Sequence, residues 1–333
     1  MSNRPSRITA EIDLGRDGKQ EGFLRLPHSV HRSAYGFLAI PIVSIRNGKG
    51  PRVLLTAGNH GDEYEGQIAL TKLVRALSLA EVSGQVIVIP MLNFPAAQAG
   101  MRTSPIDEGN LNRTFPGDAD GRPTAMIAHY VESVLMPEID VSIDLHSGGS
   151  SLVYVPGTLA RHHADKTRLE TVLGMLRAFG APNAYLMGVG AEDRSILAAA
   201  ERVGIIGMSA ELGGAGMVTR ETLGVTERGV LNVLRHLGVL SGTAEPRSTR
   251  IMQVIRAAHY VYSPDPGLFE PLAELGDGVK QGQLAGRVHF PETPWREPTP
   301  VHFLGDGLVV CKRVPARVER GDCVYHLASD LRL

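Results

Sequence analysis

The chain has 333 residues, 43% of them hydrophobic, and a formal net charge of −1 at pH 7. A chain of this length can bury one large core or two smaller ones. The near-neutral charge gives no sign of a nucleic-acid-binding surface, and no apolar stretch reaches the length of a membrane-spanning helix. We therefore expect a globular protein whose partner is a small molecule, with no nucleic-acid or membrane partner.

Cysteine content and the first residues bear on the cellular compartment. Cys311 and Cys323 are the only cysteines, too few for a disulfide framework, and this favours a reducing environment. The N-terminal segment lacks the apolar run that is typical of a signal peptide. The sequence thus predicts a cytoplasmic protein and leaves open whether it forms a homo-oligomer.

The first third of the chain alternates between strand and helix patterns. Residues 36–46 and 52–57 are apolar and β-branched, and we expect them to form paired strands around the turn at 47–50. Residues 65–80 carry apolar side chains at intervals of three and four, which predicts an amphipathic helix. A further buried strand is expected at 86–91.

The same alternation continues through the middle of the chain. Helices are expected at 125–135, 166–179, 195–203 and 225–240, and strands at 141–145 and 205–211. This order favours an α/β fold with a mixed or parallel sheet covered by helices on both faces. Ligands of such sheets bind at the carboxyl ends of the strands, where residues 58–63, 147–149 and 211–214 would lie.

The last quarter has a different pattern. Residues 241–246 resemble a linker, and beyond them short apolar runs are interrupted by glycine and proline. We therefore predict a catalytic domain over 1–242 and a small all-β domain over 247–333. The glycine-rich stretch 276–286 is expected to be a structural hairpin.

Three residues have the composition of a catalytic zinc site. His60 and Glu63 are three positions apart directly after a predicted strand, and His146 ends another. Catalytic zinc takes three nitrogen or oxygen ligands and leaves a fourth position open. The glycines beside His60 would let the backbone curl around an ion. We expect one zinc ion per chain on these residues; the alternative is an accidental cluster of polar side chains.

Glu211 closes a third apolar strand of the same sheet. A carboxylate near the metal can take a proton from water and pass it to the leaving group. Glu211 is therefore the candidate general base. A helix cap or an ion-pair partner is the alternative role for an acidic residue at a strand end.

A long polar segment over 93–117 adds candidate substrate-binding groups. It has few helix or strand formers, and loops of this length inside compact domains are usually functional. Arg102 could polarise a carbonyl oxygen, while Asn112 and Arg113 could hold a carboxylate. Solvated loop residues are the alternative reading of these arginines.

Four motifs together resemble the succinylglutamate desuccinylase and aspartoacylase family of the zinc carboxypeptidase superfamily. They are Gly-Asn-His-Gly-Asp-Glu at 58–63, Leu-Asn-Arg-Thr-Phe-Pro-Gly at 111–117, Asp-Leu-His-Ser-Gly-Gly at 144–149 and Ala-Glu-Leu-Gly-Gly at 210–214. The resemblance implies a carboxypeptidase-like α/β domain that binds one zinc ion. It also implies hydrolysis of a small-molecule N-acyl amino acid to an amine and a carboxylate.

The resemblance assigns roles to individual residues. The residues that it implies are the zinc ligands His60, Glu63 and His146, the oxyanion-stabilising Arg102, the carboxylate-binding Asn112, Arg113 and Arg194, and the base Glu211. Where the family often has Asp-Leu-Asn-Arg, this chain has Asn110 in first place. The sequence leaves open whether Asn110 or Asp144 supports a zinc-bound histidine.

Three functions are compatible with these residues. The first is a zinc-dependent amidohydrolase, and the Asn-Leu-Asn-Arg variant and the chain length resemble bacterial N-acetyl-2,4-diaminobutyrate deacetylases. The second is a zinc carboxypeptidase that acts on peptides. The third is a non-catalytic metal-binding protein of the same fold. The C-terminal β region would favour the first function if it narrowed the entrance to the site.

Overall fold

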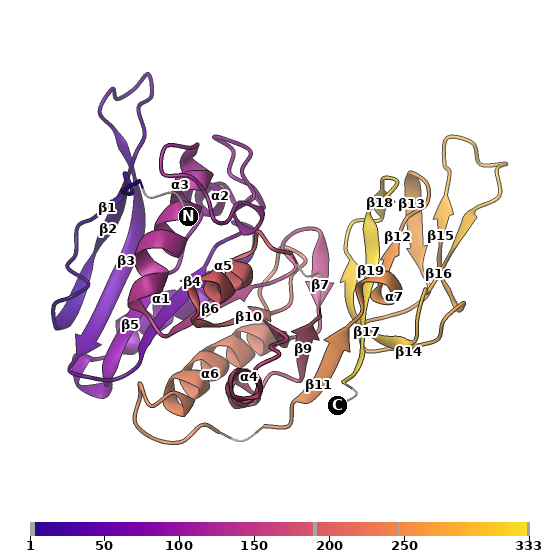
Figure 1. Cartoon of the computed structure of the whole chain (residues 1–333). Helices are drawn as coiled ribbons and strands as arrows, with labels where there is room; N and C mark the ends of the chain where they lie inside the picture. The colour runs from indigo at the N-terminus through magenta and orange to yellow at the C-terminus, as the bar shows by residue number, and fades with distance from the viewer. Residues whose placement is uncertain (1–3, 189–191, 246, 332–333) are drawn as a thin grey trace.

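The structure, a computed structural model shown in Figure 1, describes residues 4–188, 192–245 and 247–331. Its dominant element is a large mixed sheet. The strands of the first 240 residues are β1 (Thr9–Ala10), β2 (Gly18–Pro27), β3 (Phe37–Asn47), β4 (Arg52–Ala57), β5 (Gly84–Ile89), β6 (Val141–His146), β7 (Leu152–Tyr154), β8 (Gly157–Arg161), β9 (Asn183–Met187) and β10 (Ile206–Glu211).

Helices cover both faces of this sheet, as the sequence predicted. The helices are α1 (Tyr64–Ala76), α2 (Phe94–Ala99), α3 (Pro123–Tyr130), α4 (Lys166–Phe179), α5 (Ile196–Val203), α6 (Arg220–His236) and α7 (Arg256–His259). Helix α6 packs against both α1 and α4, and the three helices share one apolar core with the sheet. Helices α3 and α5 contribute to a second core on the opposite face. None of the helices in the described ranges is both long and apolar enough to cross a membrane.

The remaining strands lie in the last third of the chain. They are β11 (Arg250–Val254), β12 (Tyr260–Tyr262), β13 (Gly267–Pro271), β14 (Gly278–Val279), β15 (Leu284–His289), β16 (Thr299–His302), β17 (Gly307–Arg313), β18 (Arg317–Val318) and β19 (Cys323–Asp330). Strands β13, β15, β16 and β18 form a separate antiparallel sheet, which lies at the far right of Figure 1. An apolar core that includes Phe269, Phe303 and Tyr325 lies within this C-terminal part of the chain.

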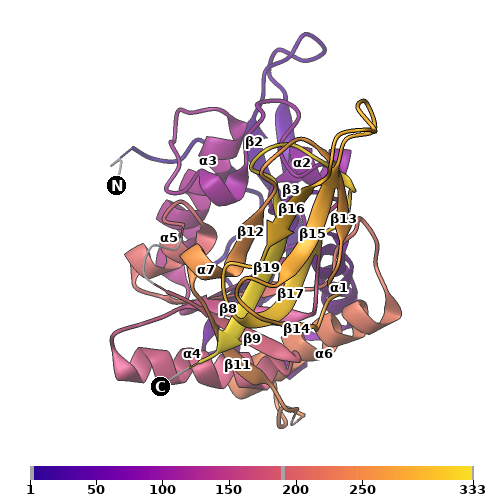
Figure 2. The same ribbon diagram turned by 90° about the vertical axis from the view of Figure 1, so that its right-hand side faces the viewer.

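Strand pairing joins the C-terminal strands to the main sheet. The order is β1-β2-β3-β5-β4-β6-β10-β8-β9-β11-β19-β17-β14, with β12 on β19 and β7 on β17. Strand β11 is parallel to β9, and β19 is antiparallel to β11. Figure 2 views the molecule from the right-hand side of Figure 1, so the C-terminal strands stand in front of the rest of the chain. The division into domains 1–242 and 247–333 stays a prediction.

Two predictions of strand pairing were wrong. Strands β3 and β4 do not pair with each other, because β5 lies between them, antiparallel to β3 and parallel to β4. The run from Gly84 to Ile89 is buried at every position, and a strand buried on both faces belongs in the middle of a sheet. Residues 276–286 are not a hairpin, since β14 pairs with β17 whereas β15 pairs with β13 and β16. That stretch connects two sheets.

The segment 93–117 is also more ordered than the sequence suggested. Helix α2 has Pro95 in its first turn and is followed by its C-cap residue Gly100, which has a positive φ of 62°. A single 3-10 turn covers Leu111–Arg113. The bounds of α2 are set by short-range features, a proline in the first turn and a left-handed glycine after the last. The rest of the segment is a loop, as predicted.

Candidate metal centre and active site

Glycines shape the turn that follows β4. Gly58 has a φ of 66°, in the left-handed region that side chains disfavour. At Gly61 a Cβ atom would lie 1.9 Å from the backbone oxygen of Ala96, so only glycine fits against α2. The Gly61 N–H donates a hydrogen bond of 2.8 Å to the Met101 oxygen. The turn is thereby fixed against the segment that carries Arg102.

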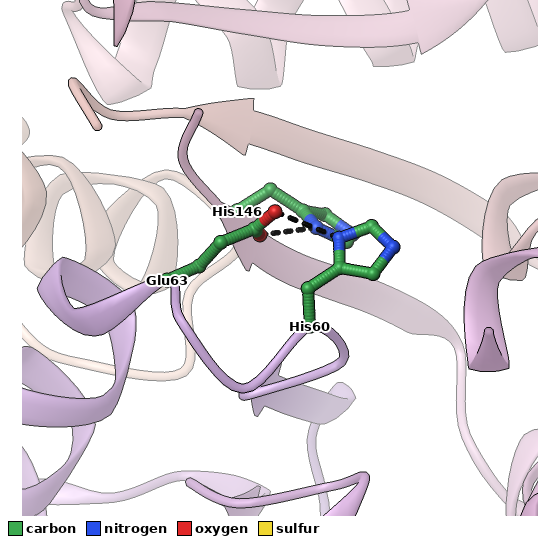
Figure 3. A group of neighbouring side chains, drawn as sticks. All are labelled: His60, Glu63 and His146. Carbon is green, nitrogen blue, oxygen red and sulfur yellow. Dashed lines mark hydrogen bonds and ion pairs between the residues drawn. The ribbon is translucent and has the colours of Figure 1, made fainter. Parts of the chain in front are cut away.

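His60, Glu63 and His146 meet at the carboxyl end of the sheet, and we call them the His-Glu-His cluster (Figure 3). Glu63 is the N-cap residue of α1, and His146 is the last residue of β6. Glu63 Oε1 lies 2.7 Å from His60 Nδ1, and Oε2 lies 2.7 Å from His146 Nδ1. All three side chains are buried, and their candidate ligand atoms lie within 4.8 Å of one another.

The second ring nitrogen of each histidine has its own partner. His146 Nε2 lies 2.6 Å from Asp144 Oδ2, and His60 Nε2 lies 3.2 Å from Asn110 Oδ1. Thr56 Oγ1 and Asn59 Nδ2 donate hydrogen bonds of 2.5 and 2.9 Å to Asp144. Metal-binding histidines are usually held in this way through the nitrogen that does not bind the metal. Both residues that the sequence left as alternatives, Asn110 and Asp144, therefore lie beside a histidine of the cluster.

The chemistry of this donor set fits a divalent zinc ion. Two imidazoles and one carboxylate supply nitrogen and oxygen ligands, and both Nδ1 atoms face the same carboxylate. Nothing in the rest of the described chain groups three such side chains in this way.

Electrostatics couples the cluster tightly. Burial lowers the pKa of His146, but the carboxylates of Asp144 and Glu63 outweigh burial and raise this pKa well above its ordinary value. Burial raises the pKa of Glu63, but His60 and His146 outweigh it and the pKa is lowered. His60, which has the weaker set of anionic neighbours, has a pKa lowered chiefly by burial. The cluster thus holds Glu63 in its ionised form, the form that binds a cation.

Glu211 lies directly beside the cluster. It ends β10, where it is the Cα partner of His146 on β6 and of Gly157 on β8. Its Oε2 atom is buried and has no hydrogen-bond partner in the part of the chain that the structure describes. Burial, and after it the charge of Glu63, raises the pKa of Glu211 to about 8. A proton acceptor with a pKa near neutrality is well suited to general-base catalysis.

Arg102 reaches the same place from the loop after α2. Its Nη1 atom lies 3.6 Å from Glu63 Oε1 and 3.4 Å from His60 Nδ1. The side chain is 42% exposed, so the guanidinium faces both the cluster and the cavity. A cation in this position can stabilise negative charge that develops on a carbonyl oxygen.

The three predicted carboxylate-binding residues differ in placement. Asn112 lies 3.4 Å from His146 Nε2 through Nδ2, and its Oδ1 accepts a hydrogen bond of 2.9 Å from the Ile196 N–H. Arg113 lines the cavity, where its Nε is 3.3 Å from Glu192 Oε2. Arg194 also pairs with Glu192, but its side chain is 63% exposed and does not line the cavity. Asn112 and Arg113 are therefore better placed than Arg194 to contact a substrate.

A cavity of about 430 Å³ opens over the cluster and extends towards the C-terminal strands. Several lining residues were not predicted as site residues, and among them are Tyr154, Arg161, Tyr185 and His326. They come from β7, β8, β9 and β19, which the sheet brings together from distant parts of the sequence. No spacing signal could have identified them, because the distance along the chain between such residues is not regular.

Comparison with known proteins identifies the family. The model of the succinylglutamate desuccinylase/aspartoacylase catalytic domain matches residues 49–237, which is more than half of the chain. A curated relative from Halomonas elongata, N-alpha-acetyl-L-2,4-diaminobutyric acid deacetylase, is 44% identical over 98% of this chain and 96% of its own length. The chain belongs to the succinylglutamate desuccinylase/aspartoacylase family. By homology it is a deacylase.

Solved structures of the family have the same fold over nearly the whole chain. A succinylglutamate desuccinylase/aspartoacylase from Rhodobacter sphaeroides is 42% identical, with a TM-score of 0.93 over 98% of this chain and 100% of that one. The product-bound ectoine utilization protein EutE (DoeB) from Ruegeria pomeroyi is 38% identical, with a TM-score of 0.94 over the same shares. The similarity therefore includes the C-terminal strands as well as the family's catalytic domain.

Proposed function

We propose that this protein is a zinc-dependent amidohydrolase that removes the acetyl group from N-acetyl-2,4-diaminobutyrate. The observation that carries the reaction class is the convergence of the His-Glu-His cluster with Glu211, whose Oε2 is unpartnered in the described part of the chain. The substrate is inferred from the Halomonas elongata relative, which bears this activity in its name and matches almost the full length of the chain.

His60, Glu63 and His146 would hold one zinc ion. When bound, zinc polarises a carbonyl group and lowers the pKa of water to near neutrality. Asp144 and Asn110 would keep each imidazole oriented through its Nε2 atom. The remaining chemistry belongs to the side chains around the cavity.

Glu211 moves the protons. In the proposed reaction the oxygen of water bonds to the carbonyl carbon while Glu211 accepts a proton from that water. The same carboxyl group then delivers the proton to the amide nitrogen as the carbon–nitrogen bond breaks, and acetate and the free amine result. Arg102 lies 3.6 Å from Glu63 and would stabilise the negative charge on the carbonyl oxygen.

The other polar residues of the cavity would orient the substrate. Arg113 presents a planar guanidinium that suits a carboxylate, and Asn112 lies between this arginine and His146. We assign to both the binding of the substrate's α-carboxylate. Arg194 would act more weakly, through the Glu192 carboxylate that it shares with Arg113.

A carboxypeptidase that acts on peptides is the second candidate function. Side chains of the C-terminal strands, including Tyr260 and His326, line the cavity and limit it to about 430 Å³. A volume of this size suits an acylated amino acid better than a peptide in an extended groove. The third candidate, a non-catalytic metal-binding protein, is disfavoured because the three ligands, the base, Arg102 and Arg113 all line the cavity.

The experiment that tests the proposal is amine release from a panel of N-acetyl, N-succinyl and N-formyl amino acids and dipeptides. The zinc-loaded protein is compared with a chelator-treated control. We expect chelator-sensitive release, fastest from N-acetyl-2,4-diaminobutyrate. Faster release from dipeptides would favour the carboxypeptidase, whereas stoichiometric zinc without any turnover would favour the binding protein.

A further inference from the structure

Four side chains from four neighbouring strands form a row along one side of the cavity. Tyr154, Cys311, His326 and Tyr260 are successive Cα partners across β7, β17, β19 and β12, and we call them the cross-strand row. Residues opposite one another in adjacent strands point to the same face of a sheet. All four line the cavity, so they share the face that a substrate would contact.

Ring contacts hold this row together. The His326 imidazole stacks on the Tyr260 ring, with centroids 4.3 Å apart and an interplanar angle of 10°. Tyr154 meets the same imidazole edge-on, with centroids 6.2 Å apart. His326 is therefore fixed in orientation between two aromatic rings, one in contact with its face.

The two ring nitrogens of His326 are buried. Neither of its ring nitrogens has a hydrogen-bond partner among the residues that the structure describes, although the residue is only 7% exposed. Most buried polar atoms in proteins are hydrogen-bonded. The Tyr185 hydroxyl makes no hydrogen bond of normal geometry in the described ranges, the Asn183 side chain being its polar neighbour, and the Tyr185 ring lies over Gly157, the strand partner of Glu211. Unpartnered atoms in a cavity wall point to a ligand.

The charge of this wall indicates which kind of ligand group it suits. The cross-strand row contains no lysine or arginine, and burial lowers the pKa of His326 to about 3, so the imidazole is neutral. A neutral imidazole nitrogen and a phenol oxygen can each accept a hydrogen bond, and aromatic faces attract cations. Burial, and after it Cys311 and Glu211, raises the pKa of Tyr154 and of Tyr185. Arg161, which lines the cavity from β8, is already paired with Asp193 and Glu201, so an ammonium group at this wall would meet hydrogen-bond acceptors and ring faces.

We propose that Tyr154, Tyr185, Tyr260 and His326 form the pocket that recognises the side-chain ammonium group of the substrate. This inference rests on the proposed function and adds to it the residues that select a diamino acid. Arg113 and Asn112 bind the α-carboxylate, and the ammonium group donates hydrogen bonds to His326 and Tyr185 beside the ring faces. His326 is thus a specificity-determining residue of a reaction whose chemistry takes place on the His-Glu-His cluster.

The test compares two substrates of similar shape on the zinc-loaded, full-length protein. N-acetyl-2,4-diaminobutyrate carries the ammonium group, and N-acetyl-2-aminobutyrate lacks it. We expect the wild-type protein to prefer the first by about a hundredfold or more in kcat/KM. His326→Leu should reduce this preference by about tenfold or more, mainly through KM, with little effect on the neutral substrate.

The chain offers a matched control for this variant. His129 on α3 is also buried, and both of its ring nitrogens also lack partners among the described residues, but it does not line the cavity. His129→Leu should keep the wild-type preference. If both leucine variants reduce the preference equally, the effect is one of stability and the proposal is wrong.

A binding measurement separates this inference from the proposed function. Calorimetry with free 2,4-diaminobutyrate and 2-aminobutyrate requires no turnover, and the preference for the diamine should fall about tenfold or more in His326→Leu. His326→Phe, which can keep the stack on Tyr260, serves if the leucine variant does not fold. An unchanged preference in a folded variant overturns the inference alone. A wild-type protein that releases no amine from any substrate overturns the proposed function.

Discussion

The two sides of the cavity are built on different physical principles. The His-Glu-His cluster consists of ionisable groups that contact one another at 2.7 Å and are supported by further hydrogen bonds to Asp144 and Asn110. The cross-strand row is neutral and is held by ring contacts, and the two ring nitrogens of His326 have no hydrogen-bond partner among the described residues. Side chains whose hydrogen bonds are all made within the protein keep one geometry, whereas buried polar atoms without a hydrogen-bond partner can bind a ligand. Under our proposal the first side sets the reaction, and the second selects the substrate.

Loss of a metal ligand should have the largest effect. We expect His146→Ala to lose bound zinc and to lower kcat/KM by roughly a thousandfold or more, because both polarisation of the carbonyl and activation of water depend on the ion. Zinc content and amine release measured on the same sample check this. His326→Leu, from the other side of the cavity, should bind zinc stoichiometrically.

Removal of the base should come next. Glu211→Gln keeps the size of the side chain but cannot accept a proton, so turnover should fall by about 10²- to 10⁴-fold. Zinc content should stay at one ion per chain, since Glu211 is not among the three clustered ligands. Wild-type turnover in this variant would show that the base has been assigned to the wrong residue.

The raised pKa of Glu211 predicts a pH-dependent stability of the zinc-free protein. The unfolded chain loses the proton of this carboxyl near its ordinary pKa of 4.5, whereas the folded chain keeps it up to about 8. The contribution of this group to stability is therefore complete below 4.5 and is lost as the pH rises to 8. Glutamine does not ionise, so the Glu211→Gln variant does not lose this contribution. Above pH 8 its free energy of unfolding should be higher than that of the wild type by roughly a few kcal/mol. Urea unfolding at pH 5 and pH 8.5 measures the difference, and an equal advantage at both values would contradict it.

The residues that support the two histidines should differ in importance. Asp144 is a buried carboxylate 2.6 Å from His146, whereas Asn110 is neutral and 3.2 Å from His60. We expect Asp144→Asn to weaken zinc binding by about 10- to 100-fold and Asn110→Ala to weaken it less. Competition with a chromophoric chelator gives both affinities. Equal losses of zinc affinity in the two variants would mean that the negative charge of Asp144 beside His146 is unimportant.

The smallest effect is expected at the exposed arginine. Arg194 is 63% exposed and its ion pair with Glu192 is screened by solvent, so Arg194→Ala should change KM by about fivefold or less. Arg113→Ala should raise KM more, because Arg113 lines the cavity. Steady-state kinetics of the two variants in one buffer gives both KM values. A larger increase in KM for Arg194→Ala than for Arg113→Ala would contradict the prediction.

The difference between the two sides also explains what the sequence could predict. The residues of the cluster stand in short motifs at strand ends, where the order of strands and helices already places functional groups. The fold class and the alternation of strands and helices could also be predicted, because hydrophobic periodicity is a local pattern in the sequence. The position of β5 between β3 and β4 did not, because apolar runs predict strands but not their neighbours.

The cross-strand row shows the limit of such reasoning. Tyr154 and His326 are brought together only because β7 and β19 both pair with β17. Nothing in the residues around His326 distinguishes it from a histidine packed in a core, such as His129. Whether such a histidine lies in a cavity wall or in a core is decided by long-range strand pairing. That pairing depends on the whole sheet rather than on a local pattern.

One measurement tests this division of roles most directly: kcat/KM of the wild type, Glu211→Gln and His326→Leu on N-acetyl-2,4-diaminobutyrate and N-acetyl-2-aminobutyrate. We predict that Glu211→Gln lowers both values by the same factor and leaves their ratio unchanged, whereas His326→Leu changes the ratio by about tenfold or more. A ratio that changes in Glu211→Gln and stays constant in His326→Leu would contradict the account.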